Sequence, residues 1–153
     1  MTTYSHSKYH SLIIEKEIEE HYKLALQHNK ILLMDIPTIY KTIEICYLAV
    51  ISNGNNLEHV PTEFKSYEMC YTAISCYNNW ALKFVPSELK TIELCYLAYS
   101  KNCWNIEFIP EEFITESMCI NIVKLHGNSL HIIPDKFKTK QLYELAMTHP
   151  NFI

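Results

Sequence analysis

Residues 37–61 read PTIYKTIEICYLAVISNGNNLEHVP, and the same pattern recurs along the chain. An aliphatic residue followed by proline marks each copy, and these pairs stand about 24 residues apart: Ile36-Pro37, Val60-Pro61, Val85-Pro86, Ile109-Pro110 and Ile133-Pro134. A hydroxyl residue follows each proline at a constant distance, as Thr42, Ser66, Thr91, Thr115 and Thr139. Because the proline pairs and the hydroxyl residues recur with the same spacing, the chain is built of tandem repeats.

Each copy predicts a helix followed by a tighter helical return. Thr42 is a good N-cap residue, and Glu44 lies in the first turn, where the helix dipole favours a negative charge. The apolar residues that follow fall on one side of a helix: Ile45, Cys46, Ala49 and Val50. Gly54 and Gly127 are expected to end their helices in the left-handed conformation. The short segment that ends at Val60-Pro61 fits a single helical turn.

A unit of this size cannot bury its own apolar stripe, so neighbouring units must cover it. We therefore expect an all-α fold, an α-solenoid of about six short helical repeats of roughly 24 residues. Residues 1–12 are expected to form an N-terminal tail, and residues 13–153 a single repeat domain. The predicted repeats are 13–36, 37–60, 61–85, 86–109, 110–133 and 134–153.

The motif of these copies resembles a known family of tandem repeats, domain of unknown function 4116, found in giant DNA viruses of protists and in some bacteria. The matching text is Pro-x-x-Phe-Lys-Thr-x-Glu-x-Cys-Tyr-x-Ala followed by Asn-Gly-x-x-Leu-x-x-Val-Pro, best seen in 37–61 and 86–110. The resemblance runs from about Ile13 to His149, and the later copies depart from it, with Ile114 in place of the lysine. It implies a helical repeat array and no catalytic residues.

Composition excludes several classes of protein. The 153 residues include 13 basic ones, all lysine, against 17 acidic ones, and the formal net charge is -4. Nucleic-acid binders concentrate positive charge, so no nucleic-acid partner is expected. Neither a secretory signal nor an apolar run long enough to span a bilayer is found, so no membrane partner is expected either. We expect a cytoplasmic protein, in the host cytoplasm or the virion if it is viral.

Cysteine and histidine are the candidates for chemistry. Four cysteines recur in register, Cys46, Cys70, Cys95 and Cys119, and are expected to be small core residues too far apart to share a metal ion. His6 and His10 would share a face of a helix, but no third ligand is in reach, and solvated tail residues are the simpler interpretation. No nucleophile elbow or phosphate-binding loop is found. The sequence thus predicts no catalytic, cofactor-binding or metal-binding residue, and no enzyme.

Aromatic residues at equivalent positions are the candidate protein-binding residues: Trp80, Trp104, Tyr47, Tyr71 and Tyr96. Aromatic rows suit protein interfaces, but the same rings can instead seal the grooves between repeats. Glu44, Glu68 and Glu93 are expected to cap helices and face solvent near Lys41, Lys65 and Lys90.

These observations favour a non-enzymatic protein–protein interaction module with an unidentified protein partner. The alternative is a self-associating structural protein, such as a virion component, because the array ends in mid-unit and its open last repeat could pair with a second copy. An enzyme or a metal-binding protein is the remote alternative.

Overall fold

The computed structural model describes residues 3–76 and 80–150, with side chains from residue 13 onward apart from the gap. Over this part of the chain every regular element is an α-helix or a 3₁₀ helix, and none is a strand. The prediction of an all-α fold is confirmed.

Long and short helices alternate along the chain. The α-helices are α1 (Thr3–Gln27), α2 (Ile43–Ser52), α3 (Tyr67–Ser75), α4 (Ile92–Lys101), α5 (Glu116–Leu125) and α6 (Lys140–Met147). Two 3₁₀ helices come between successive α-helices. They are η1 (Leu33–Asp35), η2 (Thr38–Tyr40), η3 (Gly54–His59), η4 (Thr62–Phe64), η5 (Ala81–Phe84), η6 (Ser87–Leu89), η7 (Cys103–Phe108), η8 (Glu111–Phe113), η9 (Gly127–Ile132) and η10 (Asp135–Phe137).

Helix α1 differs from the others in length and in how it ends. It runs through 25 residues and crosses position 12, where the sequence suggested that a tail gives way to the first repeat. Asn29, two residues past its end, has a left-handed φ of 53°, and the amide of Lys30 donates to the carbonyl of Ala25 at 2.9 Å. Asparagine tolerates this conformation better than most residues, so it can serve as the helix stop.

The predicted N-caps of the other α-helices are confirmed. In each case the hydroxyl oxygen accepts a hydrogen bond from the amide three residues later, at 3.2 or 3.3 Å. These caps are Thr42, Ser66, Thr91, Thr115 and Thr139. The proline that opens each copy stands at the start of a short 3₁₀ helix, where its missing amide is not needed.

The expected glycine stop is wrong, because neither glycine has a positive φ. Asn53 and Asn102 end α2 and α4 with extended backbones, and their side chains accept from the amides of Asn55 and Trp104. Close packing explains glycine better at position 127, where a Cβ would lie 2.4 Å from that of His149.

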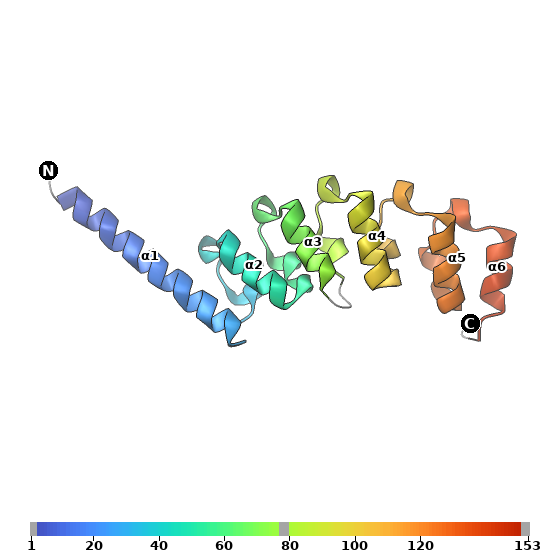
Figure 1. Ribbon diagram of the computed structural model, residues 1–153, viewed down its shortest axis with the longest axis horizontal. Helices are drawn as coiled ribbons and strands as arrows, with labels where there is room; N and C mark the ends of the chain where they lie inside the picture. The colour runs from blue at the N-terminus through green and yellow to red at the C-terminus, as the bar shows by residue number, and fades with distance from the viewer. Residues whose placement is uncertain (1–2, 77–79, 151–153) are drawn as a thin grey trace.

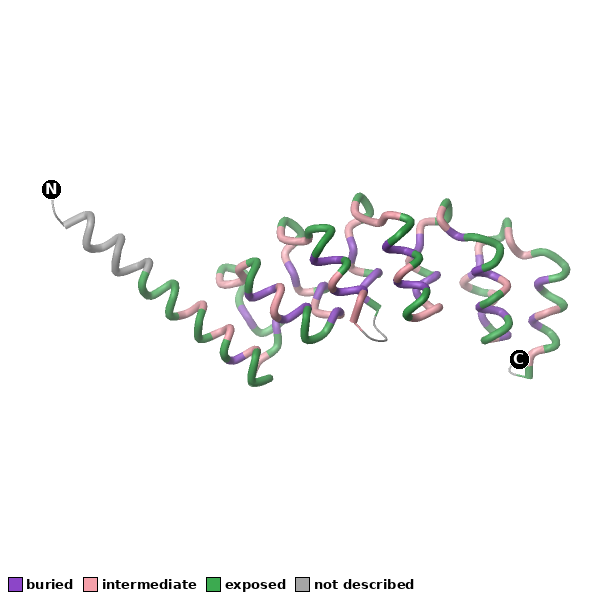
Figure 2. The backbone as a smooth tube through the Cα atoms, in the orientation of Figure 1, coloured by how far each residue is buried: buried purple, intermediate pink, exposed green. Residues whose placement is uncertain are grey.

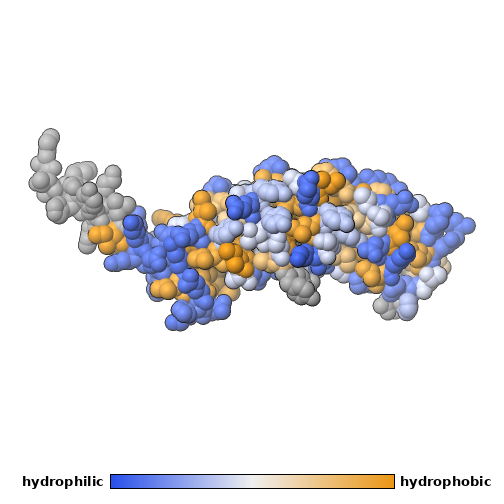
Figure 3. Space-filling model, in the orientation of Figure 1, coloured by the Kyte–Doolittle hydropathy of each residue, from blue (hydrophilic) through white to orange (hydrophobic). Residues whose placement is uncertain are grey.

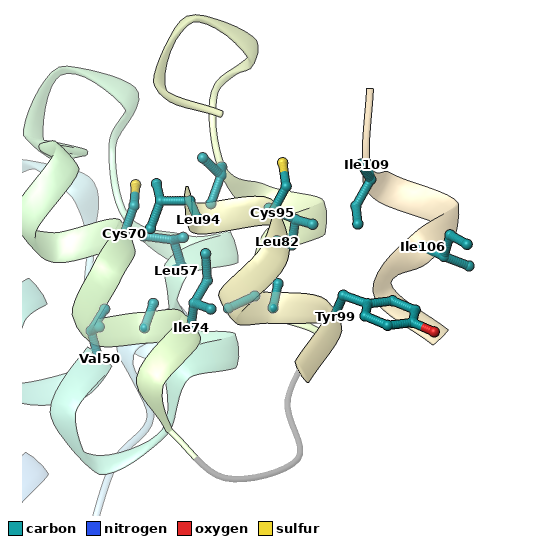
Figure 4. Packing of buried hydrophobic residues seen from close by; sticks show 14 of the residues in the cluster. Val50, Leu57, Cys70, Ile74, Leu82, Leu94, Cys95, Tyr99, Ile106 and Ile109 are labelled. Carbon is teal, nitrogen blue, oxygen red and sulfur yellow. The ribbon is translucent and has the colours of Figure 1, made fainter. Parts of the chain in front are cut away.

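The core lies between the α-helices and the longer 3₁₀ helices. The expected stripe of α2, Ile45, Cys46, Ala49 and Val50, is buried, as are its counterparts in α3 and α4. Leu57 and Leu82 of the 3₁₀ helices lie among these stripes (Figure 4), and both are buried, as is Ile106. Each copy therefore supplies one layer of a continuous core.

The elements follow one another along the long axis of the molecule (Figure 1). α2 packs on α3, α3 on α4 and α5 on α6, while η3 packs on η5 and η5 on η7. The α-helices thus form one row and the longer 3₁₀ helices a second row beside it. Figure 2 shows buried segments along the inner sides of both rows, while residues 13–27 of α1 are largely exposed.

Candidate functional site

The candidate aromatic residues lie on two different rows. Tyr47, Tyr71 and Tyr96 belong to α2, α3 and α4. Trp80 is the residue before η5, and Trp104 lies in η7. The structure therefore groups the tyrosines on the α-helical row and the tryptophans on the 3₁₀ row, so the five do not make one patch.

The tyrosines stand on the outer side of their helices. The hydroxyl of half-buried Tyr47 is 3.1 Å from the hydroxyl of Thr72 on the next helix. Tyr71 and Tyr96 are freer, with 50% and 64% of their surfaces exposed. They leave apolar ring surface in contact with solvent.

A second set of apolar residues lies one helical turn earlier on the same side. Ile43, Tyr67 and Ile92 are exposed and stand four residues before the three tyrosines. We call the six residues the tyrosine stripe: Ile43, Tyr47, Tyr67, Tyr71, Ile92 and Tyr96. Figure 3 shows orange and pale residues gathered over the middle of the molecule, where α2 to α4 lie. The i, i+4 spacing could have revealed the first-turn members, but the sequence analysis missed them.

Trp80 lies beside a hollow on the 3₁₀ row. Its ring meets that of Phe108 edge-on, with centroids 6.1 Å apart. Its backbone amide donates to the side-chain oxygen of Asn55 at 2.9 Å. The hollow has a volume of about 260 Å³ and is also lined by Lys83, whose amine lies 5.9 Å from the centroid of Phe108.

Trp104 occupies the same place in the next copy but packs differently. Its ring lies 4.9 Å from that of His126, at the start of η9, and it is only partly exposed. Each tryptophan therefore covers a junction with the copy that follows it, and each leaves part of its ring accessible.

Lys41, Lys65 and Lys90, near which the glutamates were expected to lie, have partners that the sequence did not reveal. Their amines are partly buried and donate to the backbone carbonyls of His59, Phe84 and Phe108, at 2.8, 3.0 and 2.9 Å. We call these three residues the lysine ladder. Each one joins the end of one short 3₁₀ helix to the end of the next long one, and burial lowers the pKa of Lys65 and Lys90.

The glutamate expectation holds for Glu44, which is exposed and lies in the first turn of α2. It also has a partner that the sequence did not reveal. The amine of Lys23 on α1 lies 2.6 Å from Glu44 and 3.2 Å from Glu19. This cluster joins α1 to α2, although exposed ion pairs contribute little stability.

The recurring cysteines are core residues, as expected. All six cysteines are free, and the four in register are buried. Burial raises the pKa of Cys46, Cys70, Cys95 and Cys119 to about 11. Their thiols are therefore protonated at neutral pH, and the thiolate needed for nucleophilic attack or metal binding is scarce.

No cluster of three or more metal-binding side chains occurs among the residues whose side chains the structure describes. The pair His6 and His10 lies outside those residues. Within the described ranges, no helix is both long and apolar enough to cross a membrane.

Residues 66–114 match the family model described as Domain of unknown function (DUF4116). The predicted resemblance is confirmed for this part of the chain, which runs from the N-cap of α3 to the end of η8. The matched segment contains Tyr67, Tyr71, Ile92 and Tyr96 of the tyrosine stripe and both tryptophans. No curated protein and no solved structure is similar enough to match.

Proposed function

We propose that this chain is a non-enzymatic protein–protein interaction module, built as an α-solenoid of about six helical repeats. The recurring order of α-helix, long 3₁₀ helix and short 3₁₀ helix supports the solenoid. Equivalent caps and equivalent buried stripes support it further, because each copy offers its neighbours an apolar face of the same kind.

The tyrosine stripe is the observation that carries the binding role. Three successive helices expose an aliphatic or aromatic residue in the first turn, and the tyrosine one turn later is exposed in α3 and α4 and half-buried in α2. Contiguous apolar surface on a soluble protein commonly marks an interaction site. Tyrosine suits such a site, since its ring buries a large area and its hydroxyl can still bond to the partner.

The test compares partner recovery by two double variants of the tagged full-length chain. Tyr71→Ala with Tyr96→Ala removes the exposed rings of the stripe. Glu63→Ala with Glu88→Ala changes exposed positions on η4 and η6 and serves as the matched control. A protein that co-purifies from the native source should be lost with the tyrosine variant and retained with the control. Equal recovery by both variants, each folded by circular dichroism, would contradict the proposal.

The tryptophan row supplies a further arm of the same experiment. Trp80→Ala with Trp104→Ala should retain the partner if it docks on the α-helical row. Loss with this variant, but not with the tyrosine variant, would move the binding surface to the 3₁₀ row.

Self-association is the second candidate, and the last helix favours it. Tyr143 and Met147 on α6 are 45% and 67% exposed. A second copy could cover them. Light scattering at high concentration should then detect a dimer that Tyr143→Lys with Met147→Lys abolishes, and a monomer at every concentration would exclude this candidate.

A further inference from the structure

The junction between α5 and α6 contains a hollow of about 350 Å³. These helices lie side by side at the C-terminal end of the array (Figure 1) and pack on each other. The hollow is lined by Ile120 of α5 and by Leu142 and Leu145 of α6, with Phe137 of η10 closing one side. Its polar lining includes Glu116 and Gln141, both of which are exposed.

The repeat explains why the hollow is there. Counted from the N-caps Thr42 and Thr115, Ile120 corresponds to Tyr47. Counted from Ser66 and Thr139, Leu145 corresponds to Thr72. Between α2 and α3 the phenol ring of Tyr47 reaches across and its hydroxyl meets that of Thr72. Isoleucine is too short to span the same gap, and leucine offers no hydroxyl to bond.

We propose that the hollow between α5 and α6 binds the side chain of one unphosphorylated tyrosine from a partner protein. The occupant would take the place that Tyr47 fills in its own junction. This site is separate from the tyrosine stripe, and its test does not depend on the function proposed for the stripe.

Size and lining both suit a phenol ring. An apolar cavity of about 150 Å³ in another protein is enough to hold benzene, so the larger hollow has room for a ring and its hydroxyl. Ile120, Leu145 and Phe137 provide apolar contact for the ring faces. The carboxylate of Glu116 and the amide oxygen of Gln141 can accept from the phenolic hydroxyl.

Charge distinguishes tyrosine from its phosphorylated form. Glu116 is the charged residue in the lining, and its negative charge repels a phosphate. Phosphorylation of the partner tyrosine should therefore weaken binding.

The first experiment titrates the methyl-labelled full chain with p-cresol, the side-chain analogue of tyrosine. The methyl signals of Ile120, Leu142 and Leu145 should shift and saturate, while those of Ile45 and Val50 on α2 should not. 4-Methylphenyl phosphate should bind at least about tenfold more weakly. Absence of saturable shifts with p-cresol, or equal affinity for the two ligands, would overturn the proposal.

Two double variants test the site by exchanging the junctions. Ile120→Tyr with Leu145→Thr transplants the filled junction into α5 and α6, and it should abolish p-cresol binding. Tyr47→Ile with Thr72→Leu opens the junction of α2 and α3, and a second p-cresol site should appear there, reported by the methyl group of Met69. If the first variant does not fold, the second variant still tests the proposal. If it gains no p-cresol site, the role assigned to the tyrosine ring that α5 and α6 lack is contradicted.

A single exposed substitution tests the charge argument separately. Glu116→Gln removes the negative charge and should raise the affinity for 4-methylphenyl phosphate while leaving that for p-cresol within about twofold. If the ratio of the affinities for p-cresol and 4-methylphenyl phosphate does not change, Glu116 does not exclude the phosphate.

Discussion

At the scale of single residues, the lysines of the ladder form hydrogen bonds to backbone carbonyls within the fold, besides carrying charge. The aliphatic stems of the lysine ladder are partly buried, and each amine reaches a carbonyl 18 or 19 positions further along the chain. A carbonyl at the end of a 3₁₀ helix lacks a partner within that helix, so the amine supplies the missing donor. Each bond thus ties the first part of a copy to its end.

Lys90→Met tests the ladder. Methionine keeps most of the apolar stem but leaves the carbonyl of Phe108 without its donor, so the free energy of unfolding should fall by about 1–3 kcal/mol. Urea denaturation followed by circular dichroism measures this loss. Lys124→Met, at an exposed position of α5, is the control and should change stability by less than about 0.5 kcal/mol. Equal effects of the two substitutions would contradict a structural role for the bond.

The buried thiols predict how stability depends on pH. A thiol in the unfolded chain has its ordinary pKa of 9.0, whereas burial raises the pKa of Cys46, Cys70, Cys95 and Cys119 to about 11. The unfolded state therefore loses these protons first, and their contribution to stability, complete below pH 9, is lost as the pH rises to about 11. The lowered pKa values of Lys65 and Lys90 act in the opposite direction, but the thiols outnumber them.

The urea concentration at the midpoint of unfolding should accordingly decrease as the pH is raised from 8.5 to 10.5. Cys95→Ala removes one of the four thiols and should make this fall shallower. A midpoint independent of pH over the same range would show that the thiols ionise equally in both states.

At the scale of elements, the sequence predicted what depends on neighbouring positions in the chain. The hydroxyl caps and the four-residue buried stripes follow from helical periodicity, and both are present. The lysine ladder was missed because its acceptors lie 18 or 19 positions further along the chain, and no local pattern marks a carbonyl. The glycine stop failed because Asn53 and His126, which precede the two glycines, end α2 and α5 with extended backbones. The hollow between α5 and α6 depends on comparing Ile120 with Tyr47 across a packed junction, which needs the structure.

The caps provide a prediction for a single element. Thr91 starts α4, and its hydroxyl accepts from the amide of Leu94 at 3.3 Å. Thr91→Ala should lower the free energy of unfolding by about 1 kcal/mol, because that amide loses its acceptor. Thr91→Ser retains the oxygen and should leave stability nearly unchanged in the same urea experiment. If serine were as harmful as alanine, the methyl group of threonine rather than its hydroxyl would be responsible.

At the scale of the whole molecule, the junction between α4 and α5 differs from the others. The backbones of α2, α3 and α4 approach each other directly, whereas the preceding copy approaches α5 mainly through η7 rather than through α4. Tyr99 of α4 spans this junction. Its buried hydroxyl donates to the carbonyl of Met118 at 3.0 Å and accepts from the side-chain amide of Asn121 at 3.1 Å.

In a linear array, the coupling between neighbours determines whether the chain unfolds as one unit. Tyr99→Phe removes the hydroxyl and leaves the Met118 carbonyl without its donor, which should cost about 1–3 kcal/mol at this one junction. The loss should also uncouple α5 and α6 from the rest. Hydrogen exchange followed by mass spectrometry should then show faster exchange in α5 and α6 than in α2 to α4, and the urea transition should broaden. Tyr96→Phe, one turn earlier and exposed to solvent, is the matched control and should change neither measurement. A uniform rise in exchange along the whole chain would instead mean that the copies unfold together even when this junction is weakened.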